Sequence, residues 1–194
     1  MRLKILAIGL ALWALPCAAF SGNSEPKKHQ LRVGWGDMLF ETLAFHSSTM
    51  NLYPENTHDY KYSGHIFGEY RYNFNKVTSL GLLADFESIC WTVGPDTPSR
   101  NYNLTLLPNV RFTYLNKEWV KMYSGVGIGA LAAFDNQRNI EAAPAFNLNA
   151  LGVQVGKGHW SGAIELGFMA AMRGADCIYM LGSRLVSVSL NYSW

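Results

Sequence analysis

The chain ends in Val186-Ser187-Val188-Ser189-Leu190-Asn191-Tyr192-Ser193-Trp194, nine residues in which apolar and polar side chains alternate without a break. A period of two places successive side chains on opposite faces, which is the pattern of a β-strand. Serine and asparagine fill one face, and the other face carries only apolar residues, namely Val186, Val188, Leu190, Tyr192 and Trp194. The segment is therefore predicted to be a strand with one polar and one apolar face.

The same period runs backwards along the chain as far as Leu31. Seven earlier segments alternate in this way, at 31–35, 66–72, 79–87, 106–114, 120–130, 146–155 and 163–169. In the sixth segment the phase shifts after Ala150, which indicates a β-bulge near Gly152. Short connections at 73–76, 115–118 and 156–159 alternate with longer ones at 37–60, 91–101, 133–143 and 173–181. Eight strands joined in this way predict an all-β fold, an eight-stranded antiparallel up-and-down barrel.

A period of two leaves open which face of the barrel is buried. The polar face carries little charge, and charged residues make up only 15% of the chain, below the ~25% of an ordinary soluble domain. Large aromatic residues stand near the predicted strand ends, where membrane interfaces favour them: Trp35, Tyr72, Trp91, Tyr114, Trp119, Phe134, Trp160 and Trp194. These features favour a transmembrane barrel with its apolar face outward. A lipocalin-like binder with its apolar face inward is the alternative.

The N-terminus carries the pattern of a secretory signal peptide. Arg2 and Lys4 precede an apolar run from Ile5 to Leu15, and small residues at Ala18, Ala19 and Ser21 offer cleavage sites after it. The run is shorter than the ~20 residues of a spanning helix. We expect a signal peptide at 1–21, a short periplasmic segment at 22–30 and the barrel at 31–194. Without Arg2 and Lys4, the 16 basic residues become 14, equal to the 14 acidic ones, which excludes a strongly basic nucleic-acid binder.

The last strand resembles the closing strand of outer-membrane barrels, in which alternating hydrophobic residues end in an aromatic one. The runs 107–115 (LPNVRFTYL) and 123–129 (YSGVGIG) resemble strands of the small porin-like outer-membrane β-barrel domains of the OmpA/OmpX type. The resemblance covers about Leu31 to Trp194. It implies residence in the outer membrane of a Gram-negative bacterium, among outer-membrane lipids and lipopolysaccharide. It also implies insertion by the barrel assembly machinery, which reads the last strand.

The ionisable residues of the polar face are expected to meet inside the barrel. They are four acids and three bases: Glu69, Arg71, Asp85, Glu87, Arg111, Lys121 and Glu165. An eight-stranded barrel is just wide enough for its side chains to fill, and buried charges need partners. The sequence therefore predicts a lumen plugged by a polar network. A small gated pore is the alternative.

Two cysteines, Cys90 and Cys177, remain after export, and an even pair in an exported protein permits a disulfide at the extracellular rim. Two free thiols are the alternative. The histidines show no zinc-ligand spacing and no nucleotide or kinase motif occurs, so we expect neither a metal nor a cofactor. The dipeptides at His46-Ser47 and His58-Asp59 match no motif of the lipid A acyltransferases or deacylases.

The predicted function is therefore a structural or surface-interaction role, in which long loops meet a ligand that the sequence does not name. The chain is not expected to be an enzyme or to bind nucleic acid. Two alternatives stay open, a narrow pore for ions or small solutes and a lipid A-modifying enzyme.

Overall fold

The computed structural model describes residues 27–36, 57–93, 98–134, 140–172 and 178–194. In these ranges no helix is long and apolar enough to cross a bilayer. The described part of the chain holds nine strands: β1 (His29–Gly36), β2 (Thr57–Asn73), β3 (Thr78–Val93), β4 (Pro98–Asn116), β5 (Val120–Phe134), β6 (Ile140–Val155), β7 (Trp160–Met172), β8 (Ile178–Ser183) and β9 (Val186–Ser193).

Antiparallel pairing closes these strands into a barrel. Each strand from β1 to β7 pairs with the next one in sequence. β1 also pairs with β9, and β9 pairs with β7, so the sheet has no free edge along this seam. β8 pairs with β7 as well. Because β8 and β9 pair with successive parts of β7, they lie end to end and together form the eighth strand of the barrel. The predicted fold, a closed eight-stranded antiparallel barrel, is confirmed.

The break between β8 and β9 falls at Arg184, whose φ is 61°. A left-handed backbone is uncommon for a residue with a side chain, and it interrupts regular pairing here. On either side of it, Met169 pairs with Ser183 and Leu166 with Val186. The alternating pattern predicts a loop at 173–181, whereas β8 already begins at Ile178. The alternating pattern ends at Val186 because the kink at Arg184 changes the phase of the strand.

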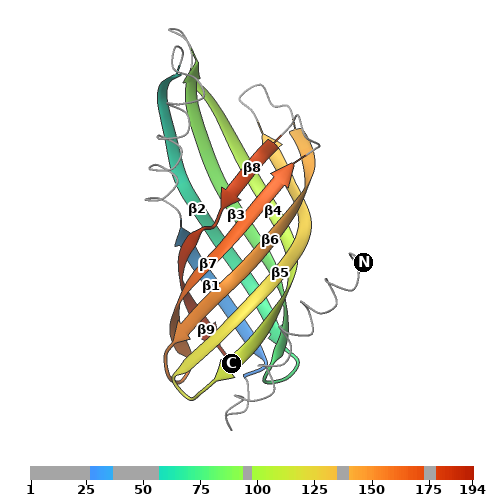
Figure 1. Cartoon of the computed structure of the whole chain (residues 1–194), viewed down its shortest axis with the longest axis vertical. Coiled ribbons are helices and arrows are strands. Elements are labelled where there is room, and N and C mark those ends of the chain that lie inside the picture. The colour runs from blue at the N-terminus through green and yellow to red at the C-terminus, as the bar shows by residue number, and fades with distance from the viewer. Residues whose placement is uncertain (1–26, 37–56, 94–97, 135–139, 173–177) are drawn as a thin grey trace, which may run out of the picture.

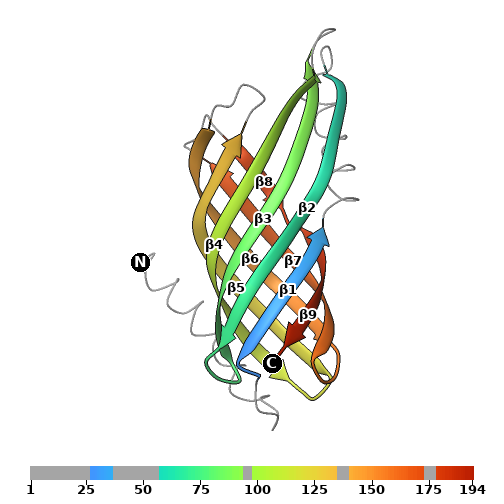
Figure 2. The same ribbon diagram turned by 180° about the vertical axis from the view of Figure 1, so that it is seen from behind.

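The short turns and the C-terminus lie together at one end of the barrel (Figure 1). β2 and β3 extend furthest at the opposite end, which both views show (Figures 1 and 2). Strands are longer at that end than the alternating pattern indicates, since β2 begins at Thr57 and β3 reaches Val93. At the short-turn end, β1 begins at His29, within the segment expected to precede the barrel.

The apolar face of the barrel points outward. In β9, Val188 is 49% and Leu190 is 55% exposed, whereas Ser187 before them and Asn191 after them are buried. The other strands repeat this division, with exposed residues such as Ile66 on the outside and Glu69 buried inside. The arrangement is the reverse of a soluble barrel, and it is the one that a barrel adopts in lipid.

The predicted bulge lies in β6 at Ala150. Asn149 pairs with Gly167 of β7 and Leu151 pairs with Leu166, so Ala150 has no counterpart on that strand. The side chain of Ser124 donates a hydrogen bond of 2.7 Å to the Ala150 carbonyl, which satisfies one of the backbone groups that the bulge removes from the ladder.

Candidate functional site

Six ionisable side chains meet inside the barrel on its short-turn side. We call them the central charge cluster: Arg32 of β1, Glu69 and Arg71 of β2, Arg111 of β4, Glu165 of β7, and Arg184 between β8 and β9. All six are nearly inaccessible to solvent. They come together because inward positions of strands distant in sequence converge on a narrow lumen.

Glu165 and Glu69 are the two acceptors of this cluster. Glu165 receives a hydrogen bond of 2.6 Å from Arg32 and one of 3.0 Å from Arg184. Glu69 pairs with Arg71 and accepts a hydrogen bond of 3.2 Å from Arg32. Arg111 lies 3.6 Å from an oxygen of each glutamate. Because buried charges are costly without partners, removing either acid would leave several arginines uncompensated.

Above this cluster, away from the short turns, the lumen is filled by apolar side chains. We call this set the apolar layer: Phe67, Leu83, Leu107, Leu131, Ala145, Met169 and Ala171. None of its members is more than 4% exposed. Phe67 joins the layer to the charges, because the guanidinium carbons of Arg184 and Arg32 lie 4.3 Å and 4.8 Å from the centre of its ring.

A second polar set lies on the loop side of the apolar layer. His65 Nδ1 is 2.9 Å from Asp85 Oδ2, and the amide of Asn103 donates a hydrogen bond of 2.6 Å to Glu87. The His65 ring stacks on Phe67 with its centroid 5.6 Å away. Two polar levels are therefore separated by one apolar level along the barrel.

The residues predicted for the lumen divide among three places. Glu69, Arg71, Arg111 and Glu165 belong to the central charge cluster, while Asp85 and Glu87 lie beyond the apolar layer. Lys121 lies at the short-turn end, where it lines a cavity with Arg111.

Sequence reasoning missed Arg32, His65 and Arg184 as members of the buried polar set. Arg32 lies between the outward-facing Leu31 and Val33, and His65 precedes the outward-facing Ile66. The alternation therefore predicts an inward side chain at both positions. Arg184 offered no such signal, because it lies at the kink where the alternation is lost.

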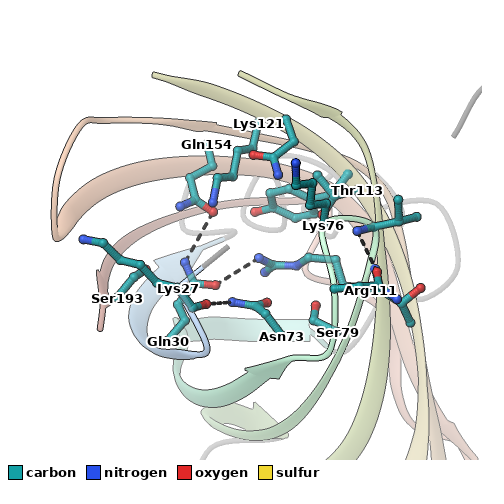
Figure 3. Close-up of a pocket in the computed structure, with 15 residues that line it drawn as sticks. Lys27, Gln30, Asn73, Lys76, Ser79, Arg111, Thr113, Lys121, Gln154 and Ser193 are labelled. Carbon is teal, nitrogen blue, oxygen red and sulfur yellow. Dashed lines mark hydrogen bonds between the residues drawn. The ribbon is translucent and has the colours of Figure 1, made fainter. Parts of the chain in front are cut away.

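The cavity has a volume of about 30 Å³ and opens at the short-turn end of the lumen (Figure 3). Four of its lining residues are basic: Lys27, Lys76, Arg111 and Lys121. The rest of its described lining is neutral and mostly amide or hydroxyl. The Asn73 amide donates to the Lys27 carbonyl at 2.6 Å, which holds the chain before β1 across this opening.

Aromatic side chains surround the outside of the barrel at the short-turn end. Trp119, Trp160 and Trp194 are exposed there, and Trp194 stacks on His29 with the ring centroids 5.6 Å apart. His29 Nδ1 lies 2.7 Å from the hydroxyl of Tyr70. Rings with one polar edge favour the boundary between lipid and water, so this belt fits a membrane interface. Trp35, which the sequence places near a long loop, is exposed on the same outer face but pairs with Ile66 in the middle of β2.

Several predicted features lie outside the described residues. These are the signal peptide at 1–21, the dipeptide at His46-Ser47 and Cys177. The side chains of His58 and Cys90 are likewise not described, although Cys90 lies within β3. The disulfide therefore stays a prediction. Among the described residues, no group of three or more His, Cys, Asp or Glu side chains is placed to hold a metal ion.

The chain is similar in structure to three solved proteins. The N-terminal β-barrel domain of Pseudomonas aeruginosa OprF aligns over 88% of this chain and 100% of that one, with 6% identity and a TM-score of 0.47. Ail, the attachment invasion locus protein of Yersinia pestis, aligns over 87% and 99%, with 12% identity and a TM-score of 0.45. Neisserial surface protein A aligns over 86% and 96%, with 11% identity and a TM-score of 0.45.

No protein-family model matches the sequence, and no curated protein does either. The strand pairing and the two faces of the sheet define the fold on their own. The chain is a closed eight-stranded antiparallel β-barrel of the outer-membrane type, with apolar residues outside and ionisable side chains within.

Proposed function

We propose that this protein is an outer-membrane barrel with a structural or surface-interaction role and a lumen that does not conduct. The apolar outer face and the aromatic belt support its placement in lipid. The pattern of short turns at one end and long connections at the other supports an orientation with the loops outside the cell. In that orientation the loops are the part available to ligands, partners or host molecules.

The apolar layer is the observation that carries this proposal. Ions cross a membrane through water, and a level of side chains at most 4% exposed offers no continuous water path. Below it, the central charge cluster fills the same cross-section with paired side chains. Two closed levels in one narrow barrel support a plugged lumen over the alternative of a pore for ions or small solutes.

Electrical recording in planar bilayers tests the proposal. The purified barrel should insert without producing stepwise conductance, while an open porin added to the same membrane should give regular steps. Insertion is checked independently by protease protection in vesicles. Reproducible channel steps from the wild-type barrel would favour the pore alternative.

The last strand is the proposed contact with the barrel assembly machinery. Its outward residues, Val186, Val188, Leu190, Tyr192 and Trp194, would present the alternating signal. The same residues, once inserted, would face outer-membrane lipid and lipopolysaccharide. Crosslinking from a photoreactive residue at position 190 should capture the assembly machinery during insertion, and only lipid afterwards. A position-190 probe that never captures the machinery would contradict this contact.

A further inference from the structure

We propose that the cavity at the short-turn end of the lumen binds a small oxyanion of the phosphate class. This goes beyond the proposed role of the barrel and does not depend on it. The cavity is lined by Lys27, Lys76, Arg111 and Lys121, and the described residues around it include no acid (Figure 3). Four basic side chains therefore line a space of about 30 Å³, and no carboxylate is among the described residues that line it.

In the part of the chain that the structure describes, no acid compensates the positive charge of Lys121. Its side chain is partly buried, and it lies close enough to Arg111 and Lys27 for their like charges to act on it. Among the described residues, nothing forms a hydrogen bond or ion pair with its ammonium group. Lys27 donates to the carbonyl oxygen of Gly158 at 2.5 Å, but a carbonyl is neutral and leaves the charge in place.

Arg111 provides a second, independent observation. Its side chain is only 6% exposed, and its Nη2 atom makes no hydrogen bond within the described structure. The nearest carboxylate oxygens, on Glu69 and Glu165, are 3.6 Å away, beyond hydrogen-bond distance. Its Nη1 atom reaches only the neutral Gln30, at 3.3 Å. A buried guanidinium nitrogen thus retains an unused donor, on a side chain that also lines the cavity.

The central charge cluster cannot neutralise this end of the lumen. It contains four arginines and two glutamates, and both glutamates are already engaged by Arg32, Arg71 and Arg184. An added anion would supply the missing negative charge. Guanidinium and ammonium groups are the protein groups that bind phosphate oxygens best.

The size of the cavity fits part of such an ion. A single water needs roughly 10–15 Å³ of this kind of space, so about 30 Å³ accepts two or three oxygen-sized atoms. Two oxygens of a phosphate group match that room, with the rest of the group toward the mouth. The mouth opens beside the short turns, so the ligand enters from that side of the membrane.

Calorimetric titration of the full barrel with inorganic phosphate tests the proposal. The barrel is held in a phosphorus-free maltoside detergent and a phosphate-free buffer. Wild type should bind phosphate saturably, and Lys121→Gln should weaken the affinity about tenfold or more. Lys117→Gln is the matched control, since it removes the same charge from an exposed turn outside the cavity. Its affinity should remain within about twofold of wild type.

A second readout guards against a variant that fails to fold. Phosphate should raise the unfolding temperature of wild type and of Lys117→Gln, but not that of Lys121→Gln. If Lys121→Gln does not fold, Lys27→Gln replaces it with the same expectation. No saturable binding to wild type, or equal loss in the Lys117→Gln control, would overturn the proposal.

The source of the phosphate group is settled by competition. Short-chain phosphatidylglycerol is added to the barrel at a saturating concentration of inorganic phosphate. Displacement of the ion indicates that a lipid headgroup enters the same cavity, whereas undiminished binding identifies the free ion as the ligand. A barrel to which neither compound binds saturably would refute the site for both sources.

Discussion

Arg32 and Glu165 pair inside the lumen, with Nη1 2.6 Å from Oε1 and Nη2 2.5 Å from Oε2, although 133 positions separate them in the sequence. Arg32 belongs to β1 and Glu165 to β7, and β9 lies between these two strands. Arg32 also donates to Ser189 of β9 at 2.8 Å. One side chain thus ties together the three strands at the seam where the barrel closes.

Replacing Glu165 with Gln should strongly destabilise the barrel. The change leaves Arg32 and Arg184 buried without their main carboxylate, which costs about 3–5 kcal/mol of unfolding free energy. Urea titration of the barrel in lipid vesicles, followed by tryptophan fluorescence, measures this. Glu118→Gln is the matched control, because its pair with Lys157 is exposed and its loss should have no measurable effect.

Phe67→Ala should be among the most damaging substitutions of a single apolar residue. It opens a cavity in the apolar layer and removes the ring that contacts Arg32 and Arg184, at a cost of about 3–5 kcal/mol. Phe74→Ala, in an exposed turn, should change stability by less than about 0.5 kcal/mol. Similar unfolding midpoints for the two variants would contradict the role assigned to the layer.

Gly152→Ala should be destabilising through a steric conflict. A Cβ at this position would lie 2.1 Å from Cε2 of Tyr123, and the Tyr123 ring cannot retreat freely because Arg111 lies 3.8 Å from its centre. We expect a loss of about 1–3 kcal/mol in the unfolding free energy. Gly68→Ala is the control, since a Cβ there meets nothing within 4 Å. A harmless Gly152→Ala would show that this packing is loose.

Deleting Trp194 should prevent stable assembly. Its backbone exchanges two hydrogen bonds of 3.0 Å with His29, which close the end of the seam between the first and last strands. Changing Tyr192 and Trp194 to Asp should have the same outcome, because both side chains face outward. The measurement is the amount of heat-modifiable barrel in outer-membrane fractions. Lys157→Asp, in a turn, should assemble normally.

Cysteine labelling tests the orientation. In a chain with Cys90 and Cys177 replaced by serine, reporters at positions 56 and 136 should react on intact cells, because the sequence places both in long loops. A reporter at Lys157 should react only after lysis, since that exposed residue lies in a short turn. Asn116, at the end of β4 beside another short turn, is buried and would make a poor reporter. Labelling of position 157 on intact cells would reverse the orientation.

Much of the fold could be predicted from local alternation. It gave the strands, the short turns, the outward face and the bulge that the structure places at Ala150. Periodicity assigns a residue to a face, and that is sufficient to count strands and to separate lipid from lumen.

Alternation does not give the height of a residue along the barrel. Leu83 and Leu107 occupy inward positions in the sequence, but only the strand register brings them opposite each other in the apolar layer. The same limit applies to Asp85, which was grouped with Glu69 although Phe67 and its neighbours separate them. Register depends on pairing between distant segments, and a single strand carries no record of it.

In the non-conducting barrel proposed above, the apolar layer and the central charge cluster close the same passage one after the other, by different physical means. The first excludes water because it offers no polar group, and the second because its side chains pair with one another and leave only isolated donors such as Arg111 Nη2. A substitution that empties one level leaves the other closed. A leak through this barrel therefore requires two simultaneous lesions, so permeability should be far more tolerant of single substitutions than stability is.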